Sequence, residues 1–422
     1  MMQTSQSLLS PLLGQKLRWL PLRMRLKKIL ARSKELQKRP QREKKLQRVR
    51  RLKSLRSMSN KIKEEQSNIK RKRTPREPLK DRTTVFLGAL TLALAFVFIL
   101  IAPKFFAQTA VSLGMDDQTV IDEVQYRHPL SGLSLDEPLE DLQIYGVMID
   151  NHVDAWPPAG IDQAALVIEA PVEASISRML AFFSEDQHVE AIGPVRSARP
   201  YYLDWNNELD ALYAHVGGSN TALDLIASGG TFDFNQYWNG GFYWRSSYRY
   251  APHNVFTSTE DMAAYVEERD EAGRAPELLY GVWKFDDSMM EGDDVTAVAI
   301  DFSAPTYYAE WEYNVEQNRY VRSQAGLAHK TDEGNQIMAN NVVVVVTDIE
   351  VIDSVGRRDV RTTGEGEGYL FQDGVMMEVT WRKPSATERL RFYNEDDQEV
   401  AMNAGITWIE VIGSVEDMKI EE

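Results

Sequence analysis

The chain has 422 residues, a formal net charge of −15 at pH 7 and no cysteine. The absence of cysteine excludes disulfides, thiol catalysis, cysteine-ligated zinc and a lipid on an N-terminal cysteine, so an extracytoplasmic domain needs a hydrophobic core for its stability. The charge is divided unevenly: residues 1–82 carry 27 Lys and Arg against 6 Asp and Glu, and the remainder carries 21 against 57. Regions so opposed in charge belong to separate environments.

Residues 1–82 are predicted to be a basic cytoplasmic tail, helical or disordered. Apolar residues recur at three- or four-residue spacing in two parts of it, which indicates basic amphipathic helix: Leu17, Leu20 and Met24, then Leu46, Val49, Leu52 and Leu55. Beside a membrane, such a tail attracts anionic lipid headgroups. The alternatives are non-specific contact with RNA or DNA and a solvated tail that only sets topology. No specific nucleic-acid partner is expected.

The next segment predicts one transmembrane helix over residues 83–106. Val85 to Ala102 are 18 residues without a charge, which at 1.5 Å per residue span most of a hydrocarbon core about 30 Å thick. The basic tail before it places the N-terminus in the cytoplasm. A cleaved signal peptide is the alternative, but it has a short basic region and an apolar stretch of about 7–15 residues. We therefore expect a single-pass cell-membrane protein with a linker over 107–128.

The extracytoplasmic region is predicted to be α+β. Residues 129–276 alternate strands with helices, which indicates an α/β-like first domain, with strands near 145–149, 164–168 and 179–183 and helices over 201–213 and 259–271. Residues 277–422 are predicted to be mostly β, as a second domain or a β extension of the first. Their strand-like segments are 296–302, 307–314, 319–322, 342–347, 375–381, 389–392 and 407–412.

Polar residues that could form a site gather in four segments. They are Glu169 to Arg178, Gly193 to Pro200, His215 to Ser219 and Arg245 to Asn254. Taken singly, each has a structural explanation, such as an arginine paired with a carboxylate, a hydrogen-bonded histidine or a glycine turn. Taken together, they place five arginines in the loops of an acidic domain. Arginine suits bidentate recognition of carboxylate or phosphate, so the segments predict an anionic ligand.

The candidate ligand-binding residues are Asn151, Arg178, Arg196, Ser197, Arg199, Ser219, Arg249 and Asn254. The candidate acid/base residues are Glu173, His215 and His253, and backbone N–H groups beside His215 would bind an anion. The sequence lacks the standard motifs of zinc proteases, serine hydrolases and nucleotide-binding loops, and no metal or cofactor is expected. Glu169 and Glu173 have the spacing of one helical face, but Pro171 between them argues against a helix interior and leaves a glycosidase geometry unsupported.

Aromatic residues run through the same stretch of chain. They are Trp205, Tyr237, Trp238, Tyr243 and Trp244. Exposed, these rings would stack on sugar rings; buried, they belong to the core. The sequence leaves both interpretations open.

At the four segments the chain resembles the YerB-like family of bacterial extracytoplasmic proteins, which are built on a domain of unknown function with a C-terminal companion domain. The resemblance covers about residues 129–412, and the combination of GPVRSAR with APHN is its most specific part. The matching residues are Met148 to Asn151, Gly193 to Arg199, His215 to Ser219, Arg249 to Asn254, His329, Asp332, Asn341 to Val343 and Gly405 to Ile409.

This sequence departs from the family pattern in three places. Ala155-Trp156-Pro157-Pro158 replaces an Ala-Arg-Pro-Gln-like stretch, so an arginine contact is lost at Trp156. Glu173-Ala-Ser-Ile-Ser177-Arg178 replaces Glu-Gly-Gly-x-Thr-Arg and keeps both charged residues. Many relatives are anchored through a lipidated cysteine, whereas here the transmembrane helix would take over anchoring. The resemblance implies location and fold but no established activity.

Three functions remain open. The leading hypothesis is a membrane-anchored protein that binds an anionic ligand, expected to be a cell-wall glycan, through a cleft lined by Arg and His. The second is an envelope hydrolase of glycosidic or phosphodiester bonds, using Glu173, His215 and His253. The third is a scaffold that recruits cell-wall enzymes, for which a large exposed apolar patch would argue.

Overall fold

The structure, a computed structural model, describes residues 126–139, 142–270 and 281–421. The predicted basic tail, the predicted transmembrane helix and nearly all of the predicted linker lie outside these residues. Within the described ranges, no helix combines the length and the apolar character needed to cross a membrane. The chain divides into a unit Met1–Thr119 and a unit Val120–Glu422, and every described residue belongs to the second.

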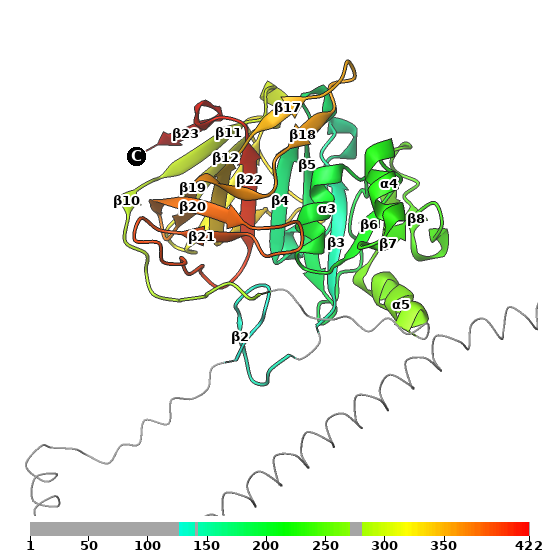
Figure 1. Ribbon diagram of the computed structural model, residues 1–422, viewed down its shortest axis with the longest axis horizontal. Helices are drawn as coiled ribbons and strands as arrows, with labels where there is room; N and C mark the ends of the chain where they lie inside the picture. Colours follow the sequence, from blue (N-terminus) through cyan, green and yellow to red (C-terminus); the bar gives the residue numbers. More distant parts are fainter. Residues whose placement is uncertain (1–125, 140–141, 271–280, 422) are drawn as a thin grey trace, which may run out of the picture. The chain divides into compact units, whose positions relative to one another are not determined.

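An 11-stranded sheet forms the centre of this unit (Figure 1). The first half of the unit supplies β3 (Ile144–Asp150), β4 (Leu166–Pro171), β5 (Ser177–Ser184), β6 (Leu212–His215) and β7 (Phe232–Asn235). The second half supplies β10 (Asp293–Asp294), β16 (Asn341–Val346), β19 (Gly364–Gln372), β20 (Val375–Lys383), β21 (Arg391–Tyr393) and β22 (Thr407–Ile412). The order across the sheet is β10-β20-β19-β16-β22-β4-β5-β3-β6-β7, and β21 also pairs with β20.

The two halves meet inside this sheet. Strands β22 and β4 are parallel neighbours, with Thr407 opposite Leu166 and Glu410 opposite Glu169. The predicted division of the chain between residues 276 and 277 stays a prediction, but strands from both sides of it form one continuous sheet.

A six-stranded sheet packs against one face of the central sheet. It contains β11 (Ala297–Asp301), β12 (Tyr308–Asn314), β13 (Arg319–Gln324), β14 (Leu327–Ala328), β15 (Met338–Ala339) and β23 (Met418–Glu421). Its Trp311 and Tyr320 share a buried core with Val167 and Trp408 of the central sheet. Helix α5 (Thr259–Asp270) adds Met262 to the same core.

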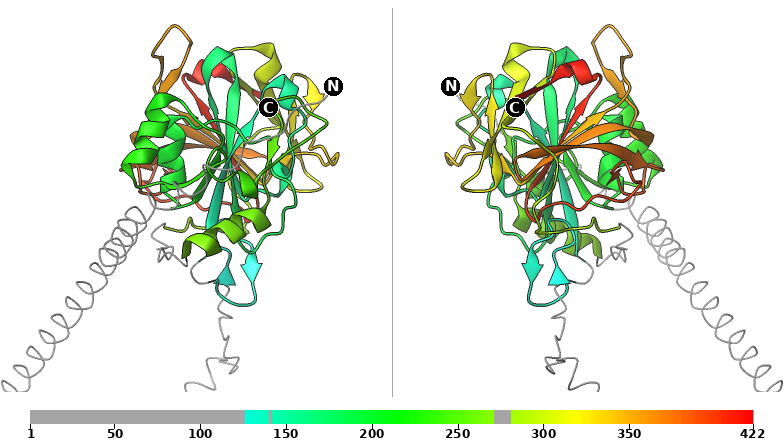
Figure 2. Two further views of the ribbon diagram at one scale, coloured as in Figure 1. Left: turned by 90° about the vertical axis from the view of Figure 1, so that its right-hand side faces the viewer. Right: turned by 90° about the vertical axis from the view of Figure 1, so that its left-hand side faces the viewer.

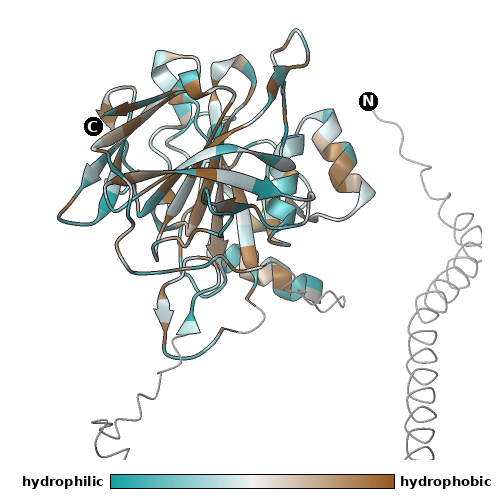
Figure 3. Ribbon diagram, turned by 60° about the vertical axis from the view of Figure 1, so that its left-hand side comes forward, coloured by the Kyte–Doolittle hydropathy of each residue, from teal (hydrophilic) through white to brown (hydrophobic). Residues whose placement is uncertain are grey.

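Two helices cover the other face (Figure 1). Helix α3 (Pro200–Asn207) buries Tyr202 and Trp205, and α4 (Asn220–Ser228) buries Ala222, in a core with Ile168 and Ile409. Neighbours along a strand point to opposite faces, and β3, β4, β5 and β22 are buried at every residue, so these strands contribute to the cores on both sides of the sheet. Much of the middle of the molecule is coloured brown, for hydrophobic residues, in Figure 3. Three short hairpins lie outside the two sheets, and two of them, β1–β2 and β17–β18, project from the body in Figure 2. They are β1 (Tyr126–Arg127) with β2 (Ser134–Leu135), β17 (Ile349–Val351) with β18 (Arg358–Val360), and β8 (Trp244–Arg245) with β9 (Val255–Phe256).

Local sequence explains where several elements begin and end. The Ser219 side chain accepts a hydrogen bond from the backbone N–H of Ala222 and caps α4, which ends at Gly229. Asp373 and Gly374 join β19 to β20 with positive φ at both residues, the backbone that a two-residue hairpin needs.

The predicted α+β class is confirmed at that level, with β-structure predominating. The helix predicted over 201–213 is wrong at its end, because α3 stops at Asn207 and β6 begins at Leu212. The helix predicted from Thr259 is confirmed over Thr259–Asp270. Its capping side chain belongs to Ser258, whose hydroxyl accepts from the backbone N–H of Asp261. Helix α4 was not predicted.

Candidate functional site

The four polar segments meet at one edge of the central sheet. Strands β3, β4, β6, β7, β16 and β22 all run in one direction, so their carboxyl ends lie at this edge. The antiparallel strand β5 begins there with Ser177 and Arg178. Open sheets with parallel strands place ligands outside the carboxyl ends of those strands. This edge is therefore the candidate site.

The loop 193–199 joins the segments to one another. The backbone N–H of Arg196 donates to the carbonyl of Met148 in β3 at 2.7 Å, and the carbonyl of Arg196 accepts from Val216 just after β6 at 3.0 Å. Further along, Ser219 donates its N–H to the carbonyl of Ala198 at 3.2 Å. The loop thus fills the space between two parallel strands where they separate.

Glu173 binds two of the predicted arginines. Its carboxylate accepts from Arg199 Nε at 2.9 Å and from Arg199 Nη2, and Arg178 Nη2 lies 3.9 Å away. Burial opposes ionisation of Glu173 and by itself would raise its pKa. The hydrogen bonds from Arg199 and the charges of Arg178 and Arg199 outweigh this effect and lower the pKa to about 2. Arg178 also donates to the carbonyl of Ser197 at 2.9 Å.

The turn after Glu173 is strained. Ala174 and Ser175 have φ values of 59° and 56°, a backbone region that L-residues seldom adopt and that glycine adopts freely. These are the two positions at which the family pattern has glycine. The ion pair with Arg199 on one side and β5 on the other hold the turn in this conformation.

We expect Glu173→Gln to remove stability at neutral pH and to cost less in acid. Because the folded pKa of Glu173 lies below its ordinary value of 4.5, the contribution of this residue is complete above pH 4.5 and is lost as pH falls toward 2. Loss of the charged hydrogen bonds should cost about 2 kcal/mol at pH 7. Urea unfolding at pH 3 and pH 7 checks this, with Glu378→Gln, an exposed residue of β20, as the control. Equal losses at both pH values would contradict it.

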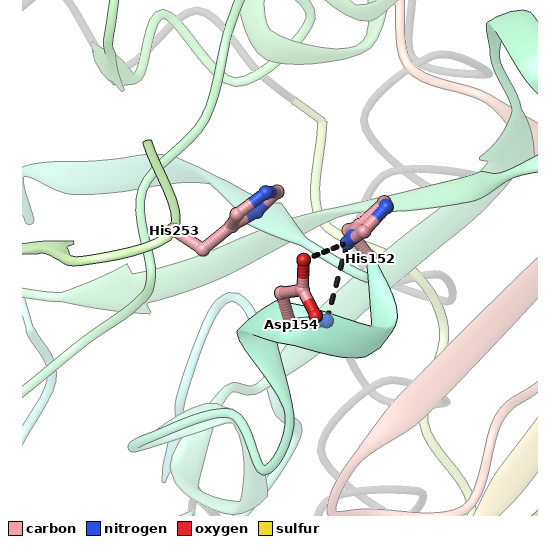
Figure 4. A group of neighbouring side chains, drawn as sticks. All are labelled: His152, Asp154 and His253. Atoms are coloured by element: carbon pink, nitrogen blue, oxygen red, sulfur yellow. Dashed lines mark hydrogen bonds and ion pairs between the residues drawn. The ribbon is translucent and has the colours of Figure 1, made fainter. Parts of the chain in front are cut away.

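Asp150, at the end of β3, forms a second cluster. Its Oδ2 lies 3.0 Å from Arg196 Nε and 2.6 Å from His253 Nδ1, and its Oδ1 accepts from the backbone N–H of His152 at 3.1 Å. The rings of His152 and His253 stack with centroids 4.5 Å apart. The side chain of Asp154 lies beside both histidines (Figure 4). Asp150 belongs to the matching segment Met148 to Asn151 but was not among the predicted site residues.

Four predicted residues are engaged in holding the loops. His215 is fully buried, with Nδ1 2.7 Å from the carbonyl of Gly217 and Nε2 2.8 Å from Asp233 Oδ1. Ser219 caps α4. Asn254 Oδ1 accepts from Arg245 at 2.8 Å, and Arg249 donates to the carbonyls of Ala155 and Pro157, each at 2.5 Å. The assignment of Ser219, Asn254 and Arg249 to a ligand, and of His215 to acid/base chemistry, stays a prediction.

Asn151 belongs to a buried polar network between the two sheets. Its amide nitrogen donates to Ser177 Oγ at 2.8 Å and to Glu169 Oε1 at 3.2 Å. Its Oδ1 accepts from Trp156 Nε1 at 2.8 Å. The tryptophan that replaces the family's arginine therefore contacts Asn151 directly.

The centre of this network is an ion cluster that was not predicted. Arg322 of β13 lies between Glu169 of β4 and Glu410 of β22, with Nη–O distances of 2.8 and 2.9 Å, and all three side chains are fully buried. The Arg322 guanidinium also lies over the rings of Trp311 and Trp408. Burial and the Glu169 carboxylate raise the pKa of Glu410 to about 8. The sequence did contain a signal for this cluster, because Glu169 and Glu410 each lie in an otherwise apolar strand, and buried charged residues are rare unless they are paired.

The aromatic residues separate into two groups. Trp205 and Tyr243 are buried core residues. Tyr237 and Trp238 are 65% and 81% exposed, and Trp244 is 39% exposed. Two further rings of the same stretch, Tyr248 and Tyr250, are 96% and 89% exposed. We call Tyr237, Trp238, Trp244, Tyr248 and Tyr250 the aromatic segment.

A cavity of about 270 Å³ opens at the same sheet edge. It lies between the ends of β4 and β22 on one side and β11 on the other, and is lined in part by Pro171, Asp301, Arg358, Ile412 and Asp417. A larger cavity of about 450 Å³ lies beside the six-stranded sheet. Neither is lined by the predicted arginines.

Two family models match this chain. The model described as the N-terminal domain of a protein of unknown function (DUF3048) matches residues 130–272, and the C-terminal domain of the same family matches residues 298–409. The chain belongs to the DUF3048, or YerB-like, family. YerB of Bacillus subtilis, a candidate lipoprotein by its name, is 28% identical over 335 residues, which cover 78% of this chain and 96% of YerB. The crystal structure of YerB matches with a TM-score of 0.62 and covers 70% of this chain and 99% of that structure.

The two most specific family motifs both lie at this sheet edge. GPVRSAR lies in the loop between β5 and α3 and hydrogen-bonds to β3 and to the residue after β6, and APHN supplies His253 to Asp150. The DUF3048 description assigns no activity.

Proposed function

We propose that this DUF3048 protein is anchored in the cell membrane and binds an anionic glycan of the cell envelope through the aromatic segment. The proposal rests mainly on the exposure of five aromatic rings within residues 237–250. Aromatic residues are enriched at binding interfaces, and apolar side chains that gather on a surface mark binding sites. Their flat apolar faces suit the C–H faces of sugar rings.

The aromatic segment has a fixed base. The hydroxyl of Tyr243 donates to the carbonyl of Phe234 in β7 at 2.5 Å, and Trp244 stacks on Phe256 of β9 at 6.1 Å. Tyr237 packs over Gly217, where a Cβ would come within 2.7 Å of its ring. The glycine turn after His215 thus makes room for an exposed ring. Because Tyr237 and Trp244 are held in this way, these two rings lose less conformational entropy when they bind.

One of the predicted arginines lies near these rings, and a second is partly exposed at the sheet edge. The guanidinium of Arg249 lies 5.5 Å from the centroid of the Phe256 ring on which Trp244 stacks. Arg196 is partly exposed at the carboxyl edge, paired on one side with Asp150. Both suit the carboxylate or phosphate groups of an acidic polysaccharide. Arg178 and Arg199 are buried against Glu173, so we assign them to the support of the site.

The envelope location rests on the likeness to YerB and on the sequence. The name of YerB describes a lipoprotein. In this chain, which has no cysteine, we assign anchoring to the apolar segment 83–106, with residues 1–82 on the cytoplasmic side against anionic lipid headgroups. The aromatic segment would then face the envelope.

Two of the three residues expected for hydrolysis, Glu173 and His215, do not favour an enzyme. A carboxyl with a pKa of about 2, such as Glu173, is ionised at neutral pH and cannot act as a general acid there. Both ring nitrogens of His215 are occupied by protein groups. Binding is therefore the better-supported function.

We expect the triple variant Trp238→Ala, Tyr248→Ala and Tyr250→Ala to weaken glycan binding at least about tenfold, because exposed Trp and Tyr side chains dominate binding energies. Equilibrium binding of purified acidic and neutral cell-wall polysaccharide fragments to the full chain measures this. Tyr126→Ala, an exposed ring on the β1–β2 hairpin, is the matched control.

Each outcome of this experiment decides part of the proposal. Unchanged affinity in the triple variant would overturn the aromatic site. If Arg196→Ala and added salt leave the affinity for acidic fragments unchanged, and neutral fragments bind equally well, the anionic part is wrong. Binding of a purified cell-wall enzyme in place of glycan would favour the scaffold hypothesis instead.

A further inference from the structure

Three potential metal ligands converge beside the end of β3. His152 caps the short helix η1 (Val153–Ala155), which contains Asp154, and His253 comes from the loop before β9. One donor atom from each residue lies within 4.8 Å of the others, as Figure 4 illustrates. The residues come from segments about one hundred positions apart, so the fold assembles the cluster.

His253 has the orientation of a metal-binding histidine. Its Nδ1 lies 2.6 Å from Asp150 Oδ2, and the Asp150 side chain is buried. Histidines that bind metals commonly donate the other ring N–H to a carboxylate, which fixes the tautomer and makes the ring a better donor. This contact leaves Nε2 of His253 available. Arg196 and the backbone N–H of His152 hold Asp150 in turn.

The other two ligands can move. The side chains of His152 and Asp154 are 33% and 70% exposed, whereas His253 is nearly buried. The two imidazoles are stacked at an interplanar angle of 20°, so their in-plane lone pairs run side by side. A tetrahedral ion with bonds of about 2.0–2.1 Å needs them to converge. Rotation of His152, with release of its 3.1 Å contact to the Asp154 N–H, would achieve this.

We propose that His152, Asp154 and His253 bind a divalent transition-metal ion of the Zn²⁺ class, with Asp150 as a positioning residue. Two imidazoles and one carboxylate match the donor set of zinc sites that keep a position open for water or a ligand. Two nitrogen donors disfavour Ca²⁺ and Mg²⁺, which prefer oxygen. This inference differs from the sequence-based expectation of no metal, and it is independent of the glycan proposal.

The test is titration of the metal-free, untagged full chain with ZnCl₂ by isothermal calorimetry, with CaCl₂ in parallel. We expect one Zn²⁺ site that is absent for Ca²⁺. His152→Ala and His253→Ala should each weaken it at least about tenfold, and Asp150→Asn by about 10- to 100-fold. His188→Ala, an exposed histidine outside the cluster, should bind Zn²⁺ as the wild type does.

A second readout identifies the ligands. Co²⁺ bound at the site should give a visible absorption band that Zn²⁺ displaces and His152→Ala removes. Far-ultraviolet circular dichroism confirms that each variant is folded, and His152, half-exposed, is the substitution least able to disturb the fold. Zn²⁺ binding that survives both histidine substitutions in folded protein would overturn the proposal, as would the absence of any Zn²⁺ binding by the wild type.

Discussion

Replacing Arg322 by methionine should destabilise the protein by about 3–5 kcal/mol at pH 7, the usual cost of removing one partner from a buried ion pair. Arg322 lies between two buried carboxylates, Glu169 at 2.8 Å and Glu410 at 2.9 Å. Methionine fills similar space but leaves the two acids facing each other without a cation. Unfolding in urea, followed by circular dichroism, measures the loss.

The site of the substitution has a matched control on the same strand. Arg319 of β13 is partly exposed, and Arg319→Met should change stability by no more than about 0.5 kcal/mol. Combining Arg322→Met with Glu169→Gln and Glu410→Gln leaves no ionisable side chain in the cluster. Because uncharged replacements of buried ion clusters can be neutral or stabilising, the triple variant should recover most of the loss. If Arg322→Met proves as stable as wild type, the ion cluster does not hold the sheets together.

The cluster shows which part of this fold could be predicted from sequence. The strand containing Trp408 and Glu410 was predicted correctly over 407–412, and the strand ending near Ile168 was placed within a few residues. Strand alternation would have put Trp408 and Glu410 on one face. Nothing local identifies the partner, because Arg322 is 153 positions from Glu169 and 88 from Glu410.

The same limit applies to the candidate site. The sequence predicted a concentration of arginines in the loops, and the structure brings the four segments to one sheet edge. The sequence could not show that Arg199 forms an ion pair with Glu173 or that Arg196 forms one with Asp150. Pairing depends on which strands become neighbours, and sequence periodicity does not determine their order. The sequence also could not tell exposed aromatic rings from buried core rings, and only their burial in the structure distinguishes the two.

Glu410→Gln should alter the pH dependence of stability at the opposite end of the scale from Glu173→Gln. The pKa of Glu410 is about 8 in the folded protein against an ordinary 4.5. Between these values the folded state binds the proton that the unfolded state has released, so the free energy of unfolding falls as pH rises. The contribution of Glu410 to the free energy of unfolding is complete below pH 4.5 and is lost as pH rises past 8.

Measured between pH 5 and pH 9, the wild type should lose roughly 3–5 kcal/mol through this residue. Glutamine keeps an oxygen to accept from Trp311 Nε1, which bonds Glu410 at 2.8 Å, and carries no charge. The variant should therefore show a much flatter profile and exceed the wild type in stability at pH 9. Glu378→Gln, exposed on β20, should retain the wild-type slope. Parallel profiles for wild type and Glu410→Gln would mean that Arg322 keeps both carboxylates ionised, and that the cluster carries a net negative charge in the core.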